Sequence, residues 1–213
     1  MRKILLFIAC VLGISASAQS VRMKDVFAAM PDSLMPMVTT NNRLDCIDFI
    51  ENNMEAKVQN RVEEYVELKM LTEDYLLFQL SEVSHVEMKL LTVSDTLQVV
   101  CLVRTRRGAV ADSHVEFYNA KDWSHLAVGI AEHLNGDRPE AEAFFAGTAG
   151  LDDKERGLVE NAKLMLRDLP LLEARLSPDA PTITWTMGVD ELPKDEKKVA
   201  QKLVAPLTLS LLK

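Results

Sequence analysis

The chain has 213 residues, which is enough for one domain with a substantial hydrophobic core. It carries 24 Lys and Arg residues against 32 Asp and Glu residues, and its formal net charge is −8 at pH 7. So acidic a surface repels nucleic acids and anionic lipids, and we therefore exclude both as expected partners.

The first residues have the layout of a secretory signal peptide. Arg2 and Lys3 give a positive start, the apolar run Ile4–Ile14 follows, and the small residues Ser15–Ala18 match a cleavage site. The apolar run is shorter than the roughly 20 residues that a membrane-spanning helix needs. No second run of this kind follows, so we expect an exported chain without a transmembrane segment.

We predict cleavage after Ala18, which makes residues 1–18 the signal peptide and residues 19–213 a single domain in the periplasm or cell envelope. Loss of the two basic residues would take the net charge from −8 to −10. Two alternatives stay open. A lipid could be attached at Cys10, and the mature chain could divide into two helix-plus-hairpin halves, residues 19–123 and 124–213.

The N-terminal part of the mature chain has a helical pattern. A short amphipathic helix is expected over Met23–Met30 and ends at Pro31. A second helix begins at Asn41 or Asn42, either of which can cap its first turn. Its apolar residues recur at steps of three and four and predict one buried stripe, made of Leu44, Ile47, Ile50, Met54 and Val58.

The middle of the chain alternates between apolar and polar residues with a period of two, which predicts strands. Five strands are expected: around Val66, Leu68 and Met70, over Tyr75–Leu80, around Val86, Met88 and Leu90, over Leu97–Thr105, and around Val115 and Phe117. The polar turns between them leave no room for crossover helices, so we predict an antiparallel meander.

The C-terminal part combines helices with one hairpin. We expect a helix over Leu151–Leu169, strands over Leu171–Leu176 and Thr182–Met187, a charged helix over Lys194–Val204, and an apolar tail, Leu207–Leu212. The predicted fold class is therefore α+β, with an antiparallel meander of about five to seven strands. Helices should pack on one face of this sheet, and its other face should be exposed to water.

A short repeat places Ser-His-Val-Glu in two of the predicted strands. His85 therefore shares a sheet face with Glu87, and His114 shares one with Glu116. In a meander the strand Leu97–Thr105 separates the two pairs by roughly 10 Å, and its bulky side chains argue against a shared metal site. We expect a polar sheet surface with exposed ion pairs, and a metal-dependent hydrolase that uses this His/Glu face is the enzymatic alternative.

The one concentrated basic cluster of this acidic chain comprises Arg104, Arg106 and Arg107, at the end of a predicted strand. Arginine offers a planar fork of donors, so the cluster could bind an anion or the carboxylate of a partner. An edge charge that prevents pairing between molecules explains the same pattern, and we favour this explanation.

Two cysteines, Cys46 and Cys101, would remain after cleavage. An exported protein can join them in a disulfide, but a chain of this length has no need of a cross-link, so we favour two buried thiols. The sequence contains no Gly-x-Ser-x-Gly motif and no cysteine close to a histidine. We accordingly predict no catalytic residue, no metal ligand and no cofactor.

Several segments together resemble a domain-of-unknown-function family of exported proteins from Bacteroidales-type bacteria. They are the export signal, Pro31–Leu34, Asn42–Phe49, the acidic turn Thr72–Asp74, and Phe117-Tyr118 ahead of Trp123. The resemblance covers nearly all of the mature chain. It implies the cell envelope of an anaerobic gram-negative bacterium, and it brings no activity, cofactor or catalytic residue.

These observations favour a non-enzymatic envelope protein that binds a peptide, a glycan or another envelope protein. The candidate binding residues are His85, Glu87, Arg104, Arg106, Arg107, His114 and Glu116. A structural or chaperone-like component is a further alternative, in which Phe144-Phe145 and the tail Leu207–Leu212 dock on a partner.

Overall fold

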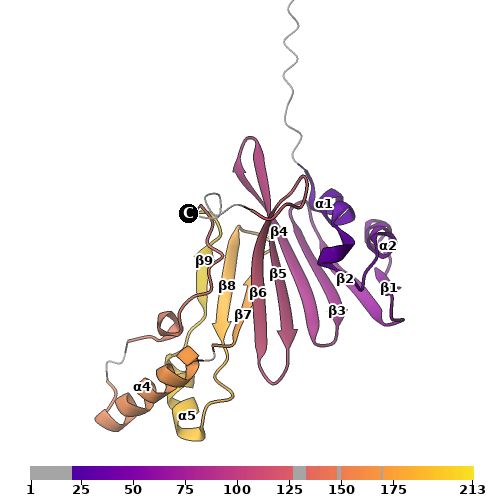
Figure 1. Cartoon of the computed structure of the whole chain (residues 1–213). Coiled ribbons are helices and arrows are strands. Elements are labelled where there is room, and N and C mark those ends of the chain that lie inside the picture. Colours follow the sequence, from indigo (N-terminus) through magenta and orange to yellow (C-terminus); the bar gives the residue numbers. More distant parts are fainter. Residues whose placement is uncertain (1–20, 127–132, 148–149, 169) are drawn as a thin grey trace, which may run out of the picture.

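The computed structural model describes residues 21–126, 133–147, 150–168 and 170–213. The predicted signal peptide, residues 1–18, and the alternative lipid site at Cys10 lie outside these residues. The larger of two sheets contains six antiparallel strands in chain order (Figure 1). They are β1 (Lys57–Gln59), β2 (Tyr65–Leu71), β3 (Tyr75–Ser81), β4 (Ser84–Ser94), β5 (Leu97–Arg107) and β6 (Ala111–Asn119).

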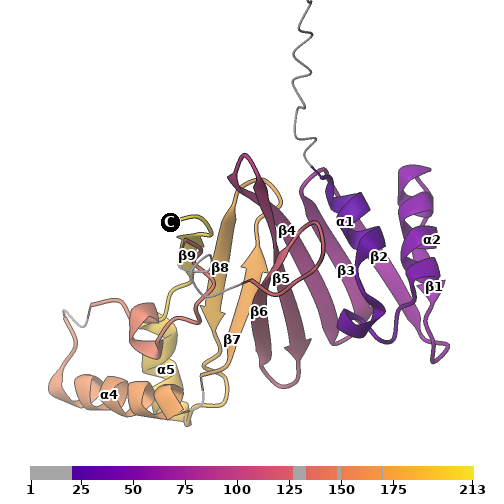
Figure 2. The ribbon, with the colours of Figure 1, turned by 45° about the horizontal axis from the view of Figure 1, so that its top comes forward.

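Helices α1 (Met23–Ala29) and α2 (Thr40–Glu51) cover one face of this sheet (Figure 2). Their apolar side chains form a first core with the sheet residues that point to the same face. Phe27 packs on Phe78 with ring centroids 5.4 Å apart, and the indole Nε1 of Trp123 donates to the carbonyl oxygen of Val26 at 3.1 Å. The helices therefore cover the face of the large sheet to which Phe78, Met88 and Leu102 point.

Helix α2 differs from its prediction at both ends and in its buried face. Its cap is Thr39, whose hydroxyl accepts from the backbone of Asn42 while the Asn42 side chain accepts from the Thr39 backbone. The helix ends at Glu51, so Met54 lies beyond it and is 50% exposed. Leu44 is 47% exposed as well, because the helix turns its polar residue Arg43 toward the core instead.

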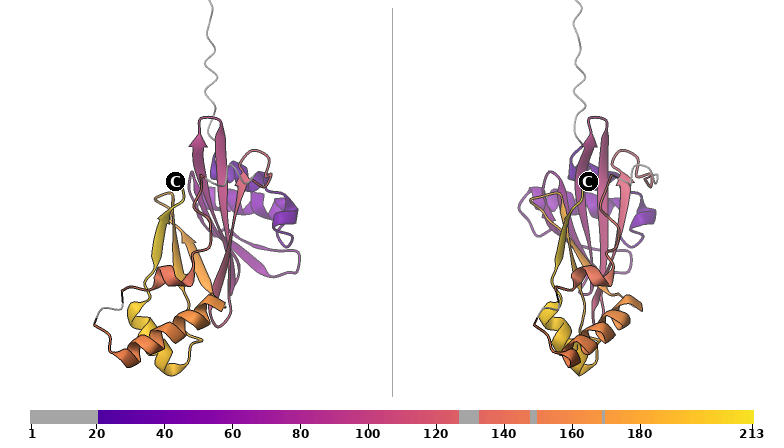
Figure 3. Two further views of the ribbon diagram at one scale, coloured as in Figure 1. Left: turned by 60° about the vertical axis from the view of Figure 1, so that its left-hand side comes forward. Right: turned by 90° about the vertical axis from the view of Figure 1, so that its left-hand side faces the viewer.

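The second sheet contains β7 (Leu172–Leu176), β8 (Thr182–Met187) and β9 (Leu207–Ser210) in that order. It lies on the side of the large sheet opposite to α1 and α2, as Figure 3 shows. Helices α4 (Asp153–Asp168) and α5 (Lys194–Leu203) extend from one end of this small sheet. Two short 3₁₀ turns complete the described elements, η1 (Asp32–Leu34) and η2 (Ala141–Phe144).

A second core lies between the two sheets and combines residues of β4–β6 with residues of β7 and β8. The α+β meander with helices on one face is therefore confirmed, but the expected water-facing second face is wrong across β4–β6. His85, Glu87 and Lys89 of this face are all buried. The prediction failed because alternation along a strand cannot show that a distant hairpin covers the polar side.

The C-terminal tail is part of the fold. Its residues Leu207–Ser210 form strand β9, and Leu211 is fully buried. Phe144 is buried too, and Phe145 bridges to Val204. These apolar segments therefore pack against other parts of the same chain. Among the described residues, no helix combines the length and the apolar character required to cross a bilayer.

Candidate functional site

The strand register places the two His/Glu pairs on opposite faces of the large sheet. His85 lies opposite Thr105, which lies opposite Ser113, so these three share the face under the small sheet. His114 lies opposite Arg104 on the helix-covered face. The two pairs are offset by one residue, and with a period of two this offset separates them. The expectation of one shared His/Glu face is therefore wrong, and the described residues contain no group of three or more metal-ligating side chains.

Glu87 connects the two sheets. Its side chain is 2% exposed, and its Oε2 accepts from the backbone N–H of Leu176 at 2.7 Å and from the hydroxyl of Tyr75 at 3.3 Å. Its Oε1 accepts from Nη1 of Arg175 at 3.1 Å. Burial, together with the neighbouring carboxylate, raises the pKa of Tyr75 above its ordinary value.

Two further side chains of β6 make the same kind of contact with β7. The hydroxyl of Ser113 accepts from the backbone of Ala174 at 2.9 Å, and the carboxylate of Asp112 accepts from the backbone of Leu172 at 3.1 Å. With Glu87, these groups satisfy every second N–H of β7, on the edge that β8 does not pair. A buried, unpaired backbone N–H is costly, so these polar residues stabilise the contact between the sheets.

His85 contributes little to this network. Its Nε2 is 3.4 Å from Oε1 of Glu87, and the geometry gives it no hydrogen-bond partner among the described residues. His114 is exposed, 3.8 Å from Oε1 of Glu116. The contacts of Glu87 therefore point to a structural role, and neither histidine lines the cavity described below.

The basic cluster is divided between the two faces of the large sheet. Arg107 points to the side of the small sheet and forms an ion pair with Glu173 at 3.0 Å. Arg104 points to the helix side, where it forms an ion pair with Glu116 and donates to the carbonyl oxygen of Leu34 at 3.2 Å. Arg106 is exposed on the same side as Arg104 and makes no ion pair or side-chain hydrogen bond within the described part of the chain.

A groove of about 330 Å³ opens beside Arg104 and Arg106, at the end of the sheet where β1–β2 and β3–β4 turn. We call it the methionine–arginine groove. Its residues are the apolar Leu34, Met35, Pro36, Met37, Val62, Leu80 and Val86, the polar Asn60, Ser81 and Ser84, and the charged Glu64, Arg104 and Arg106. Of the apolar lining residues, Val62 is 52% exposed and Met37 is 44% exposed. Exposed apolar residues grouped around a concave site are typical of binding surfaces.

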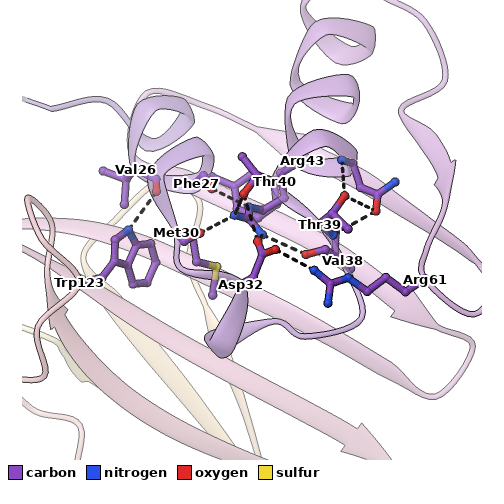
Figure 4. Close-up of polar contacts among 11 residues, drawn as sticks. Val26, Phe27, Met30, Asp32, Val38, Thr39, Thr40, Arg43, Arg61 and Trp123 are labelled. Carbon is purple, nitrogen blue, oxygen red and sulfur yellow. Dashed lines mark hydrogen bonds and ion pairs between the residues drawn. The ribbon is translucent and has the colours of Figure 1, made fainter.

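The wall of the groove over residues 34–37 belongs to a segment that Arg43 holds at both ends (Figure 4). The buried guanidinium donates to the carbonyl oxygen of Met30 and to that of Val38, the latter at 3.0 Å. Its Nε donates to the carbonyl oxygen of Phe27 at 3.1 Å. The sequence between Met30 and Val38 is thereby closed into a loop of defined shape, so this wall is already formed before a ligand arrives.

Asp32 completes the anchor of this loop. Its carboxylate accepts from Nη1 of Arg43 at 3.1 Å, from Nη2 of Arg61 at 2.9 Å and from the hydroxyl of Thr40 at 3.1 Å (Figure 4). Desolvation acts to raise the pKa of Asp32. The hydrogen bonds from Thr40 and Arg43, with the positive charges of Arg43 and Arg61, outweigh it and hold the pKa below its ordinary value.

A larger hollow of about 430 Å³ lies beside α1 and the end of α2, where Arg22, Lys24 and Glu51 line it. Its cations are already paired, because Lys24 forms an ion pair with Glu51 and Arg22 forms one with Asp25. We therefore take the methionine–arginine groove, which contains an unpaired arginine, as the candidate site.

Both cysteines are free thiols, and they lie in different cores on opposite faces of the large sheet. Burial raises the pKa of Cys46 to about 11 and raises that of Cys101 as well. The two thiols are therefore not joined, and neither is placed or activated for chemistry at the groove.

Sequence reasoning identified Arg104 and Arg106 but missed the rest of the groove. Its apolar wall comes from irregular segments, the loop over residues 34–37 and the turn that holds Val62. Neither segment has a periodic pattern. The two methionines around Pro36, of which Met35 is buried and Met37 exposed, were the only local signal, and they do not indicate which strands lie beside them.

Among solved structures, the following one shares this fold. It is described as the structure of a domain of an uncharacterized protein from Porphyromonas gingivalis W83, with a TM-score of 0.68 and 24% sequence identity. The similarity covers 87% of this chain and 91% of that chain. The comparison with curated proteins finds no significant match.

A family model described as "Protein of unknown function (DUF3256)" matches residues 15–210, which is nearly the whole chain. The predicted resemblance to a domain-of-unknown-function family is thereby confirmed. The description of this family assigns no activity to its members. The chain belongs to the DUF3256 family.

Proposed function

We propose that this protein is a non-enzymatic, exported binding protein that takes a peptide segment of a cell-envelope partner into the methionine–arginine groove. The observation that carries the proposal is a preformed apolar groove with an arginine, Arg106, that has no partner among the described residues. The loop anchor at Arg43 supports it, because a rigid wall lowers the entropy lost on binding.

The lining favours a peptide over a glycan. Methionine side chains adapt to many apolar shapes and are common at surfaces that bind peptides, and Met35 and Met37 both line this groove. None of its described lining residues is aromatic, so a sugar ring would have no stacking partner. The polar groups of Asn60, Ser81 and Ser84 can instead hydrogen-bond a peptide backbone.

The C-terminal tail and Phe144, the segments that a chaperone-like role would use, do not compete with the groove. The tail forms β9 and Phe144 is buried, so neither is available for a partner in this fold. The contacts between the large and small sheets support the view that residues 19–213 act as one unit.

Two displayed peptide libraries, one with both peptide ends tethered and one with a free C-terminus, together test binding at the groove. We expect selected peptides to bind the wild type and to lose at least tenfold in affinity for Met37→Asp or Val62→Asp. Leu164→Asp is the matched control, because Leu164 is equally exposed on α4, outside the groove lining. No selected binder, or binding that is equally affected by all three variants, would contradict the proposal.

Export is tested separately, on the protein from its native cell. The signal-like N-terminus predicts recovery in the periplasmic or envelope fraction, with Gln19 as the first residue. A protein that keeps Met1 and is recovered from the cytoplasm would contradict the export proposal and leave the binding proposal to its own test.

A further inference from the structure

We infer that the methionine–arginine groove recognises the free C-terminal carboxylate of a peptide that ends in an apolar residue, with Arg106 as the partner of the carboxylate. This inference rests on the proposed function and makes it specific. Internal peptide segments carry no backbone charge, whereas a C-terminus always does, and it is this charge that the groove can distinguish.

Arg106 differs from the other arginines nearby in having no acidic partner among the described residues. Arg104 is held by Glu116, Arg107 by Glu173, and Arg61 by Asp32. Arg106 alone among these four has no acidic partner in the described part of the chain, although it lines an apolar groove. A guanidinium binds a carboxylate through two parallel hydrogen bonds, which are stronger than neutral ones.

Ser84 is positioned to bind the same ligand group as Arg106. It lies directly opposite Arg106 in the β4–β5 register and lines the same groove. Directly opposite side chains have Cβ atoms about 5 Å apart, so both can reach one ligand group. The carbonyl of Ser84 accepts from Gln79, but its hydroxyl has no partner among the described residues. The hydroxyl and the guanidinium together suit the two oxygens of one carboxylate.

The size and the charge of the groove also favour the end of a peptide chain. The volume of about 330 Å³ is near the lower end of the usual range for ligand sites, which accommodates the end of a chain better than a long segment. Glu64 at the same groove and the net charge of −8 disfavour a second carboxylate. One anionic group next to one apolar side chain therefore matches the site better than an acidic peptide does.

The test compares N-acetylated peptides of the sequence Gly-Ser-Gly-Lys-Ala-X, where X is Leu, Met or Phe, as free acids and as C-terminal amides. We expect the acid to bind the full mature chain at least tenfold more tightly than the amide for one or more of the three. In Arg106→Gln, the affinity for the free acid should differ from the affinity for the amide by less than twofold. Arg106→Lys keeps the charge without the fork and should give an intermediate ratio.

Arg107→Gln is the matched control, since it removes the same charge from the adjacent residue on the opposite face, and it should keep the wild-type ratio. Equal binding of acid and amide, or a ratio that survives Arg106→Gln, would overturn this inference. If only tethered internal peptides bind, the inference fails and the proposed function stands. If neither class of peptide binds, both fail.

Discussion

Arg43 and Asp32 form an ion pair of 3.1 Å in which the arginine side chain is fully buried and the carboxylate is partly exposed. The pair joins helix α2 to the start of the loop that lines the groove. Because the same guanidinium also binds the carbonyl oxygens of Met30 and Val38, one side chain of the core determines the shape of the binding surface.

Replacement of Arg43 should strongly destabilise the protein. In Arg43→Met, the carbonyl oxygens of Met30 and Val38 lose their donor, that of Phe27 loses one of two, and Asp32 loses a charge partner, so we expect a loss of about 3–5 kcal/mol in the free energy of unfolding. Urea unfolding at pH 7 measures it. Arg61→Met is the control, because Arg61 is half exposed and binds Asp32 alone, and it should lose less than about 1 kcal/mol. Equal losses in the two variants would disprove the anchoring role of Arg43.

The lowered pKa of Asp32 predicts a stability that depends on pH. The ordinary pKa is 3.8, and the folded-state pKa lies below it. The stabilisation is therefore complete well above the ordinary value and is lost as the pH falls through the folded-state pKa. We expect the stability difference between the wild type and Asp32→Asn to be largest at pH 7 and to shrink below about pH 5.

Thermal unfolding at a series of pH values measures this difference. Asp95→Asn serves as the control, because it removes the same charge from an exposed turn where the carboxylate has no described partner. A difference for Asp32→Asn that stays constant from neutral to acidic pH, or that merely parallels the control, would show that the ion pairs of Asp32 do not stabilise the fold.

Glu87 should control how firmly the small sheet is attached. Glu87→Ala leaves the N–H of Leu176 without an acceptor and Arg175 with one partner fewer, so we expect a loss of about 3 kcal/mol. Hydrogen exchange should accelerate most at Leu176, and less at Ala174, which Ser113 still binds. Glu173→Ala, which breaks only surface ion pairs, should leave the exchange of Leu176 nearly unchanged. Slow exchange at Leu176 in Glu87→Ala would refute this account.

The cysteines should be unreactive in the folded protein. Both are buried thiols with raised pKa values, that of Cys46 being about 11, so almost no thiolate is present at pH 8. Iodoacetamide at pH 8 should label neither cysteine in the native mature chain and both in guanidinium chloride without a reductant. Failure to label them after unfolding would reveal a disulfide.

Local pattern was sufficient for β2–β6 of the large sheet but missed β1, because its residue Val58 continues the apolar spacing of the predicted second helix. The alternation in Val86, Met88 and Leu90 predicted β4, since a strand with one apolar face shows its period directly in the sequence. The hairpin of β7 and β8 was predicted for the same reason. The buried face of α2 was predicted only in part, because Ile47 is buried as expected but Arg43 is buried in place of Leu44, and a pattern of apolar residues cannot locate a buried arginine.

The candidate site is formed by strands and loops that lie far apart along the chain and meet only in the folded protein. The sequence by itself determined the α+β class, the antiparallel character of the predicted strands, and an arginine cluster at the end of β5, since these follow from local period and composition. Only the tertiary structure decided that Arg107 faces Glu173 while Arg106 faces a groove, that His85 and His114 lie on opposite faces, and that Glu87 is covered. Register, and the burial of one sheet by another, arise from long-range packing, which no short stretch of residues encodes.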